Sequence, residues 1–145
     1  RIETAALVEP ILRHAAELIE KAYGPEHPAT ASAIAKLAQS LIRSDHLDEA
    51  KQLIERSLAI YEKHFGEQHD KTAAAIELLA NWYAAGRDYA AALPLQERAV
   101  RILRQSGSDE RGTVQNSLIT LGGYRANLGD KSGAVTAYQE VWRVL

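Results

Sequence analysis

Hydrophobic residues recur at helical spacing along most of the chain. In the stretch 30–44, TASAIAKLAQSLIRS, the apolar positions fall on a helical repeat, at Ile34, Leu37, Ala38, Leu41 and Ile42. Such spacing gathers them on one face of a helix and leaves the opposite face polar. The stretch 48–65, DEAKQLIERSLAIYEKHF, shows the same periodicity with a broader apolar face. The pattern therefore predicts two amphipathic helices in succession.

Capping residues indicate where these helices begin and end. The turn SDHLDE between them contains Asp45 and Asp48, and we expect one of these to cap the second helix through its carboxylate. Gly66 follows the second helix, and glycine is common at helix C-termini because it adopts the left-handed backbone conformation easily. Each pair of helices is therefore expected to form a hairpin with a polar turn.

The same pattern returns after 42 residues without a gap. The loops GPEHPAT at 24–30 and GEQHDKT at 66–72 share Gly, His and Thr in the same order, while SDERGTV at 108–114 is a less faithful copy. The helices align as well, in the sets Ile34, Ile76 and Leu118; Leu37, Leu79 and Leu121; Ala38, Ala80 and Gly122; and Ala50, Ala92 and Ala134. A fixed period of this length indicates hairpins that bury their apolar faces by stacking, with the small residues where helices cross closely.

Three prolines bear on the helix boundaries. Pro10 and Pro94 are separated by twice the repeat period, and Pro28 follows a loop. Proline breaks a helix interior but fits the first turn, where backbone N–H groups have no partner. We therefore expect all three prolines to lie in the first turns of helices.

The sequence thus predicts an all-α protein of about seven helices, built as an α-solenoid of antiparallel helical hairpins. In this interpretation residues 1–145 form a single array. Residues 6–23 are the second helix of an incomplete repeat, and residues 30–65, 72–105 and 113–145 are repeats 1, 2 and 3. Because the chain begins at Arg1 and contains no methionine, we expect it to be a fragment of a longer protein.

Composition and motifs argue against several classes of function. The formal net charge of −2 offers no basic face to nucleic acid, and the absence of cysteine rules out disulfides. No apolar run approaches the roughly 20 residues of a membrane span, so we expect no membrane association and a cytoplasmic location. The sequence also lacks a Gly-rich phosphate loop, a nucleophile elbow and a His-Glu metalloprotease motif. We therefore expect no enzymatic activity and no cofactor.

The histidines are candidates for metal ligands. His64, His69 and Asp70 lie close in sequence, but they cross a helix end and their spacing matches no zinc motif. His27 and His69 occupy equivalent positions in the two similar loops. For both we favour a structural role, in which each histidine caps a helix end or packs on the next turn, and we expect no metal.

The aligned positions resemble a tetratricopeptide repeat. That family's pattern is Trp-x2-Leu-Gly-x2-Tyr followed by Ala-x3-Phe and Ala. The second repeat matches it with Ile76, Leu79, Ala80, Tyr83, Ala92, Gln96 and Ala99. The third repeat departs from it at Arg125, beside Tyr124. The 42-residue period, longer than the usual one, is similar to the repeats of kinesin light chains.

This resemblance implies a right-handed superhelix whose first helices line a concave groove. In such arrays the groove binds a peptide or a partner helix, so a protein partner is expected. Carried over from the family, the groove positions of this chain include Ser32, Gln39, Arg43, Glu77, Asn81, Asn116 and Asn127. Among them Arg43 suits a carboxylate and Glu77 a basic side chain.

An alternative function is that of a structural or sensor segment. In a larger signalling protein the array would pack against an effector domain and regulate it. We also expect Trp142, Val144 and Leu145 to be partly uncovered at the end of the array, where apolar surface favours self-association.

Overall fold

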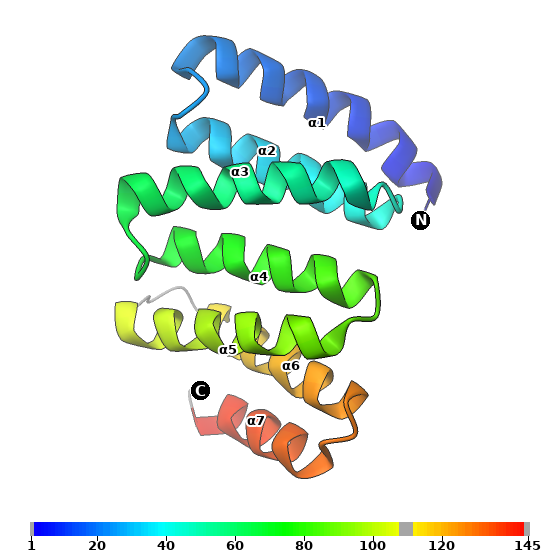
Figure 1. Ribbon diagram of the computed structural model, residues 1–145, viewed down its shortest axis with the longest axis vertical. Coiled ribbons are helices and arrows are strands. Elements are labelled where there is room, and N and C mark those ends of the chain that lie inside the picture. The colour runs from blue at the N-terminus through cyan, green and yellow to red at the C-terminus, as the bar shows by residue number, and fades with distance from the viewer. Residues whose placement is uncertain (1, 108–111, 144–145) are drawn as a thin grey trace. The chain divides into compact units, whose positions relative to one another are not determined.

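The computed structural model describes residues 2–107 and 112–143, with side chains from Leu7 onward (Figure 1). These residues form seven helices and no strand, which confirms the all-α prediction. The helices are α1 (Ile2–Tyr23), α2 (Pro28–Arg43), α3 (Leu47–Phe65), α4 (Asp70–Ala85), α5 (Tyr89–Ser106), α6 (Thr113–Asn127) and α7 (Lys131–Arg143). The chain divides into an N-terminal unit, Arg1–Gly66, and a C-terminal unit, Glu67–Leu145, which are described separately.

In the N-terminal unit α2 packs against both α1 and α3. Its apolar face is buried, as the periodicity predicts, and Leu37 and Leu41 are at most 3% exposed. Ile54 from α3 is fully buried. Ion pairs join α1 to α3 at the surface, through Arg13 with Glu49 and Arg56 with Glu20. The unit is therefore held by an apolar interior with charged pairs around it.

In the C-terminal unit each helix packs against the next, from α4 through α7. One buried cluster joins α5, α6 and α7 through Val100, Leu118, Leu121 and Ala137. A second joins α4, α5 and α6 through Ala80, Ala92 and Tyr124. Ala80 and Ala92 are fully buried, so these small residues do lie at close helix crossings. The third repeat has Arg125 where the family pattern has tyrosine. The aromatic side chain of this second cluster comes from the preceding residue, Tyr124.

The repeated loops owe their histidines to helix capping. His27 is the N-cap of α2, and its Nδ1 accepts a hydrogen bond from the Ala29 backbone N–H at 3.0 Å. His69 does the same for α4, accepting from the Lys71 N–H at 3.0 Å. A helix N-terminus has backbone donors without intrahelical partners, and each histidine satisfies one of them. The structural role expected for both residues is confirmed.

The expected cap of α3 is wrong. The N-cap is His46, whose side chain makes no capping hydrogen bond. Asp48 lies one residue inside the helix, and Asp45 adopts a left-handed conformation with φ of 66° in the turn. The turn between α2 and α3, residues 44–46, closes through backbone hydrogen bonds such as that from the His46 N–H to the Leu41 oxygen. Gly66 does follow α3 as predicted, with φ of 84°.

Two of the three proline predictions are also wrong. Pro28 opens α2, as expected. Pro10 and Pro94 instead lie inside α1 and α5, because these helices begin at Ile2 and Tyr89, more than one turn before each proline. Both prolines are exposed, and so is Ala90, whose backbone oxygen Pro94 leaves without its usual N–H partner.

The glycine pair in α6 reflects close packing at one of its two positions. Gly122 is buried, and a Cβ at this site would lie 2.8 Å from Cδ1 and Cζ of Tyr138 in α7. Gly123 has open space in the same direction. Close helix packing therefore accounts for Gly122. The third loop, in its residues 108–111, and the end residues Val144 and Leu145 lie outside the described residues.

Candidate functional site

The groove residues predicted in the N-terminal unit lie on one face of α2. Gln39 and Arg43 are one helical turn apart, and Ser32 lies two turns before Gln39. Ser32 is half-buried and hydrogen-bonds the hydroxyl of Tyr61, which partly opposes the rise in the Tyr61 pKa caused by burial. Arg43 forms no ion pair among the described residues, so its guanidinium is available to a ligand.

The groove residues predicted in the C-terminal unit lie on α4 and α6. Asn81 is exposed and Asn116 is at least partly so, and their side-chain amides make no hydrogen bond among the described residues. Asn127 is also exposed, but its Nδ2 donates to the Gly123 oxygen at 2.9 Å in its own helix. Glu77 lies on α4. Two amides and one carboxylate thus remain candidates for ligand contacts in this unit.

The structure brings Glu77 together with two side chains from other helices. Gln96 Nε2, from α5, donates to Glu77 Oε2 at 2.9 Å and to the Ser117 backbone oxygen at 3.0 Å. Ser117 Oγ, from α6, donates to the same Glu77 oxygen at 2.6 Å. Gln96 is fully buried and Ser117 is 2% exposed. We call Glu77, Gln96 and Ser117 the polar cluster.

The pKa of Tyr124 is affected by the charge of Glu77 in the polar cluster. Burial raises the pKa of Tyr124 to about 12, and the charges of Glu77 and Tyr89 contribute in the same direction. The Tyr89 ring lies 6.0 Å from the Tyr124 ring, centre to centre. The carboxylate of Glu77 therefore acts electrostatically on a buried tyrosine in addition to accepting its two hydrogen bonds.

The groove prediction includes Glu77 but not the two residues that hold it. A signal for them exists in the repeat register. Gln96 aligns with the buried Ile54, and Ser117 aligns with Ala75, so both are polar where another repeat is apolar. The register shows these two exceptions, but it does not show that they meet Glu77, because the three residues come from three different helices.

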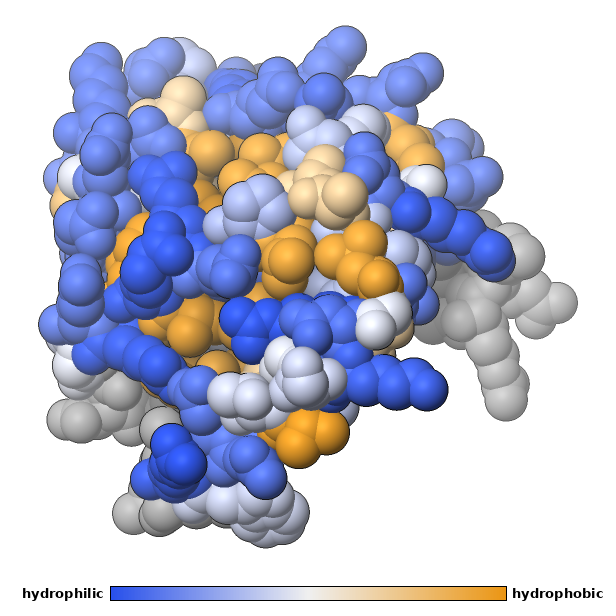
Figure 2. Space-filling view, turned by 60° about the horizontal axis from the view of Figure 1, so that its bottom comes forward, coloured by the Kyte–Doolittle hydropathy of each residue, from blue (hydrophilic) through white to orange (hydrophobic). Residues whose placement is uncertain are grey.

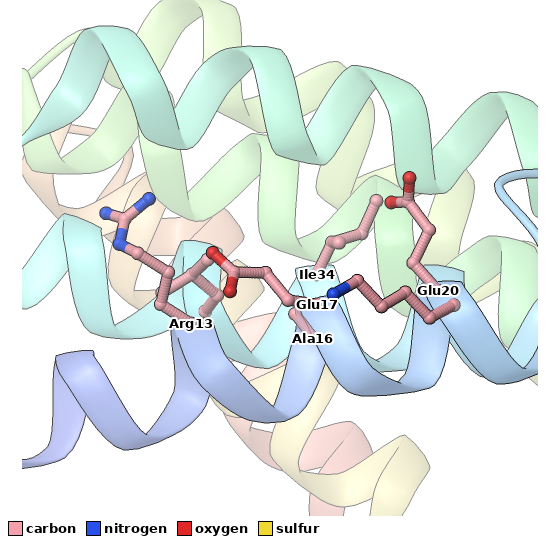
Figure 3. Close-up of a pocket in the computed structure, with 7 residues that line it drawn as sticks. Arg13, Ala16, Glu17, Glu20 and Ile34 are labelled. Carbon is pink, nitrogen blue, oxygen red and sulfur yellow. The ribbon is translucent and has the colours of Figure 1, made fainter.

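A pocket of about 280 Å³ lies in the N-terminal unit between α1 and α2. Four charged residues and one alanine of α1 line it together with two apolar residues of α2: Arg13, Ala16, Glu17, Glu20, Lys21, Ile34 and Leu37. Figure 3 shows Arg13 and Glu20 toward its two ends, with Ile34 between them. Arg13 is already paired with Glu9 and Glu49, and the guanidinium lowers the pKa of the Glu49 carboxyl. Since its charges are mixed and partly neutralised, the pocket shows no clear ligand preference.

The described part of the chain shows neither a metal cluster nor a helix suited to a membrane. No group of three or more His, Asp or Glu side chains in that part is placed to hold a metal ion. None of the described helices has both the length and the apolar character needed to cross a membrane.

The arrangement of helical hairpins and their repeat register define an all-α helical-repeat protein. A family model for the tetratricopeptide repeat matches residues 9–63 and 43–105. The chain belongs to the tetratricopeptide repeat family, whose members are generally protein–protein interaction modules. No curated protein matches the chain.

Solved structures share this fold. BtubC (BKLC) from P. vanneervenii is 19% identical with a TM-score of 0.84, over 98% of this chain and 57% of that one. A putative kinesin light chain from Podosopora anserina with nearly identical TPR-like repeats is 24% identical with a TM-score of 0.74, over 99% of this chain and 72% of that one. A single-substitution variant of that protein gives the same values. The chain therefore spans little more than half the length of BtubC and resembles kinesin light chain repeats in fold.

Proposed function

We propose that this protein is a non-catalytic scaffold in which each unit binds an extended peptide, or a helix of a partner protein, through the exposed faces of its own first helices: α2 in the N-terminal unit, and α4 and α6 in the C-terminal unit. Membership of the tetratricopeptide repeat family supports a role in protein interaction. The main support for the proposal is that several predicted groove residues have side chains without a hydrogen-bond or ion-pair partner in the described part of the chain. Arg43, Asn81 and Asn116 have side chains without a partner among the described residues, and Glu77 is held in place on α4.

These groups suit a peptide backbone and its side chains. An extended peptide presents N–H and C=O groups that side-chain amides such as those of Asn81 and Asn116 can bind. Arg43 can take a carboxylate through two parallel hydrogen bonds. Ala74, which is exposed on α4 near Glu77, leaves room for a ligand backbone to approach. The face of α2 thus offers a positive charge, and the face of α4 and α6 offers amide hydrogen bonds and a negative charge.

A peptide-library binding screen tests this proposal. The whole chain would be compared with an Arg43→Ala/Asn81→Ala variant whose circular dichroism is unchanged. We expect wild-type protein to select peptides by sequence, and the variant to lose affinity by about tenfold or more, as when charged and amide contacts to a ligand are removed.

A matched control is available on α5. Arg101 and Gln105 are exposed on this second helix, and Arg101→Ala/Gln105→Ala removes one guanidinium and one amide, as the test variant does. This control should bind as wild type does. Equal losses in both variants, or no selective peptide at all, would show that the first helices are not the recognition face.

A second candidate function is supported by exposed apolar residues on α1 and α7. Leu7 and Ile11, one turn apart on α1, are 73% and 68% exposed, and Trp142 on α7 is 75% exposed. Figure 2 shows a face on which hydrophobic areas lie between hydrophilic residues. Such surface favours packing against a neighbouring protein domain, which the segment would then restrain, or against a second copy of the chain.

The apolar faces can be tested separately from peptide binding. An Ile11→Glu/Trp142→Glu variant should lose any concentration-dependent increase in sedimentation coefficient that the wild-type chain shows. It should bind selected peptides unchanged if these faces serve a separate role. Loss of peptide binding in this variant would instead make them part of the peptide site.

A further inference from the structure

We infer that Glu77 is a specificity point for a lysine side chain of the bound peptide, and that Gln96 and Ser117 make it select lysine over arginine. This inference rests on the proposed function, since it names the side chain that the α4–α6 face recognises. Its basis is the polar cluster, where a carboxylate is held by two buried residues without a cation.

The charge of Glu77 has no partner within the described residues. No Lys, Arg or His nitrogen among them lies within 4.0 Å of its carboxylate, whereas Glu97 and Glu140 of the same unit pair with Arg125 and Arg104. A carboxylate held against buried groups is costly to desolvate without a compensating charge. A cation from a ligand would supply that charge.

The hydrogen-bond inventory of the polar cluster also has a surplus of acceptors. The Gln96 amide nitrogen and the Ser117 hydroxyl already donate within the cluster. Yet Gln96 Oε1 is buried without a hydrogen-bond partner, and Glu77 Oε1 receives no donor among the described residues. Buried polar atoms are usually satisfied, so an orphan acceptor beside an unpaired carboxylate points to a missing donor of positive charge.

Another repeat of the chain has apolar residues at the positions of the polar cluster. In the register of the previous repeat, Ala35, Ile54 and Ala75 occupy the positions of Glu77, Gln96 and Ser117. Ile54 is fully buried and Ala75 is 2% exposed, so apolar residues fill these positions well. A polar cluster placed where apolar packing suffices costs stability. Recognition of a ligand gives these residues a purpose that packing does not.

The geometry favours lysine over arginine. Arginine binds a carboxylate best when its planar fork reaches both oxygens at once. In the polar cluster Glu77 Oε2 already accepts hydrogen bonds from Gln96 and Ser117, so only Oε1 remains for a ligand. A lysine ammonium is a compact charge that needs a single oxygen, and it fits this one-sided site.

The experiment uses the whole chain and three pools of amidated peptides of about 12 residues, randomised except for one central position fixed as Lys, Arg or Gln. We expect wild-type protein to retain the Lys pool about tenfold more than the Gln pool, with the Arg pool between them, as for a charge pair at a partly desolvated site. Glu77→Gln should lose this preference for Lys. Glu67→Gln, which neutralises an exposed carboxylate of the same unit, should keep it.

Ser117→Ala gives a readout that a purely structural role would not change. Alanine is the residue found at this position in the other two repeats, so the fold should tolerate it. The substitution removes one donor from Glu77 Oε2 and opens that oxygen to an arginine fork. The ratio of Lys-pool to Arg-pool binding should therefore fall by several-fold while total binding remains.

Failure of this inference can be distinguished from failure of the proposed function. Binding that is equal for the three pools, or a Lys preference that survives Glu77→Gln, overturns this inference and leaves the proposed function standing. Binding of none of the pools overturns both. A Lys preference that Glu77→Gln abolishes, with a lowered Lys-to-Arg ratio in Ser117→Ala, supports the inference.

Discussion

At the scale of single residues, the loop histidines cap the helices that follow them. His27 and His69 accept from backbone N–H groups at the starts of α2 and α4, each at 3.0 Å. Histidine is an uncommon N-cap, but its neutral Nδ1 is an adequate acceptor. This explains why two loops 42 residues apart keep the same residue.

Removal of a histidine cap should lower stability. We expect His27→Ala to reduce the free energy of unfolding by about 1 kcal/mol, the usual effect of losing an N-cap, as measured by chemical denaturation. His27→Asn should retain most of the stability, since asparagine caps well. His14, inside α1, provides the control, and His14→Ala should change little. A loss of stability in His14→Ala equal to that in His27→Ala would contradict the capping role.

Tyr124 gives a residue-scale prediction about pH. Its folded pKa of about 12 lies above the ordinary value of 10.0, so the folded state holds the phenolic proton more tightly than the unfolded state. The resulting stability is complete below pH 10 and is lost as the pH rises from 10 toward 12. Tyr124→Phe should therefore weaken the fall in unfolding free energy over this window. Glu77→Gln should lower the Tyr124 pKa in a spectrophotometric titration, because the charge of Glu77 raises it.

At the scale of helices, the repeat register predicts where close crossings occur. Ala92 on α5 is fully buried against Ala80 and Tyr124, whereas Ala90 on the same helix is less enclosed. Ala92→Leu should overpack this crossing and lower the unfolding free energy by about 1–3 kcal/mol. Ala90→Leu should be nearly neutral. Thermal unfolding of both variants checks the register, and an unchanged midpoint in Ala92→Leu would count against it.

The glycine pair of α6 offers a second test at this scale. Both Gly122 and Gly123 gain helix propensity on change to alanine, but only Gly122 faces the Tyr138 ring. Gly122→Ala should therefore be less stable than Gly123→Ala by about 1–3 kcal/mol. Comparing the two variants in urea removes the shared propensity effect. Equal stabilities would show that α6 and α7 do not cross closely at Gly122.

Sequence periodicity predicts the helices well because burial of an apolar stripe determines them locally. It places α4 and α6 within two residues of their observed starts. It fails at Pro94, since a helix can begin before a proline when the freed oxygen remains near solvent. It also fails to find the polar cluster, because Gln96 and Ser117 acquire meaning only through contact with Glu77 from another helix.

At the scale of the whole molecule, we expect the chain to recognise a peptide through its first helices. The side chains of Arg43 on α2 and Asn81 on α4, unpartnered within the described residues, support this role. On the second helices, Arg56 of α3 and Arg104 of α5 are already paired with Glu20 and Glu140.

The most direct measurement is an amide chemical-shift map of the isotope-labelled chain during titration with a peptide selected from the library. We predict that the largest shift changes fall on α2, α4 and α6, near Arg43, Glu77 and Asn81, with small changes on α3 and α5. Changes centred on α3 and α5, or confined to the apolar faces of α1 and α7, would contradict peptide recognition by the first helices.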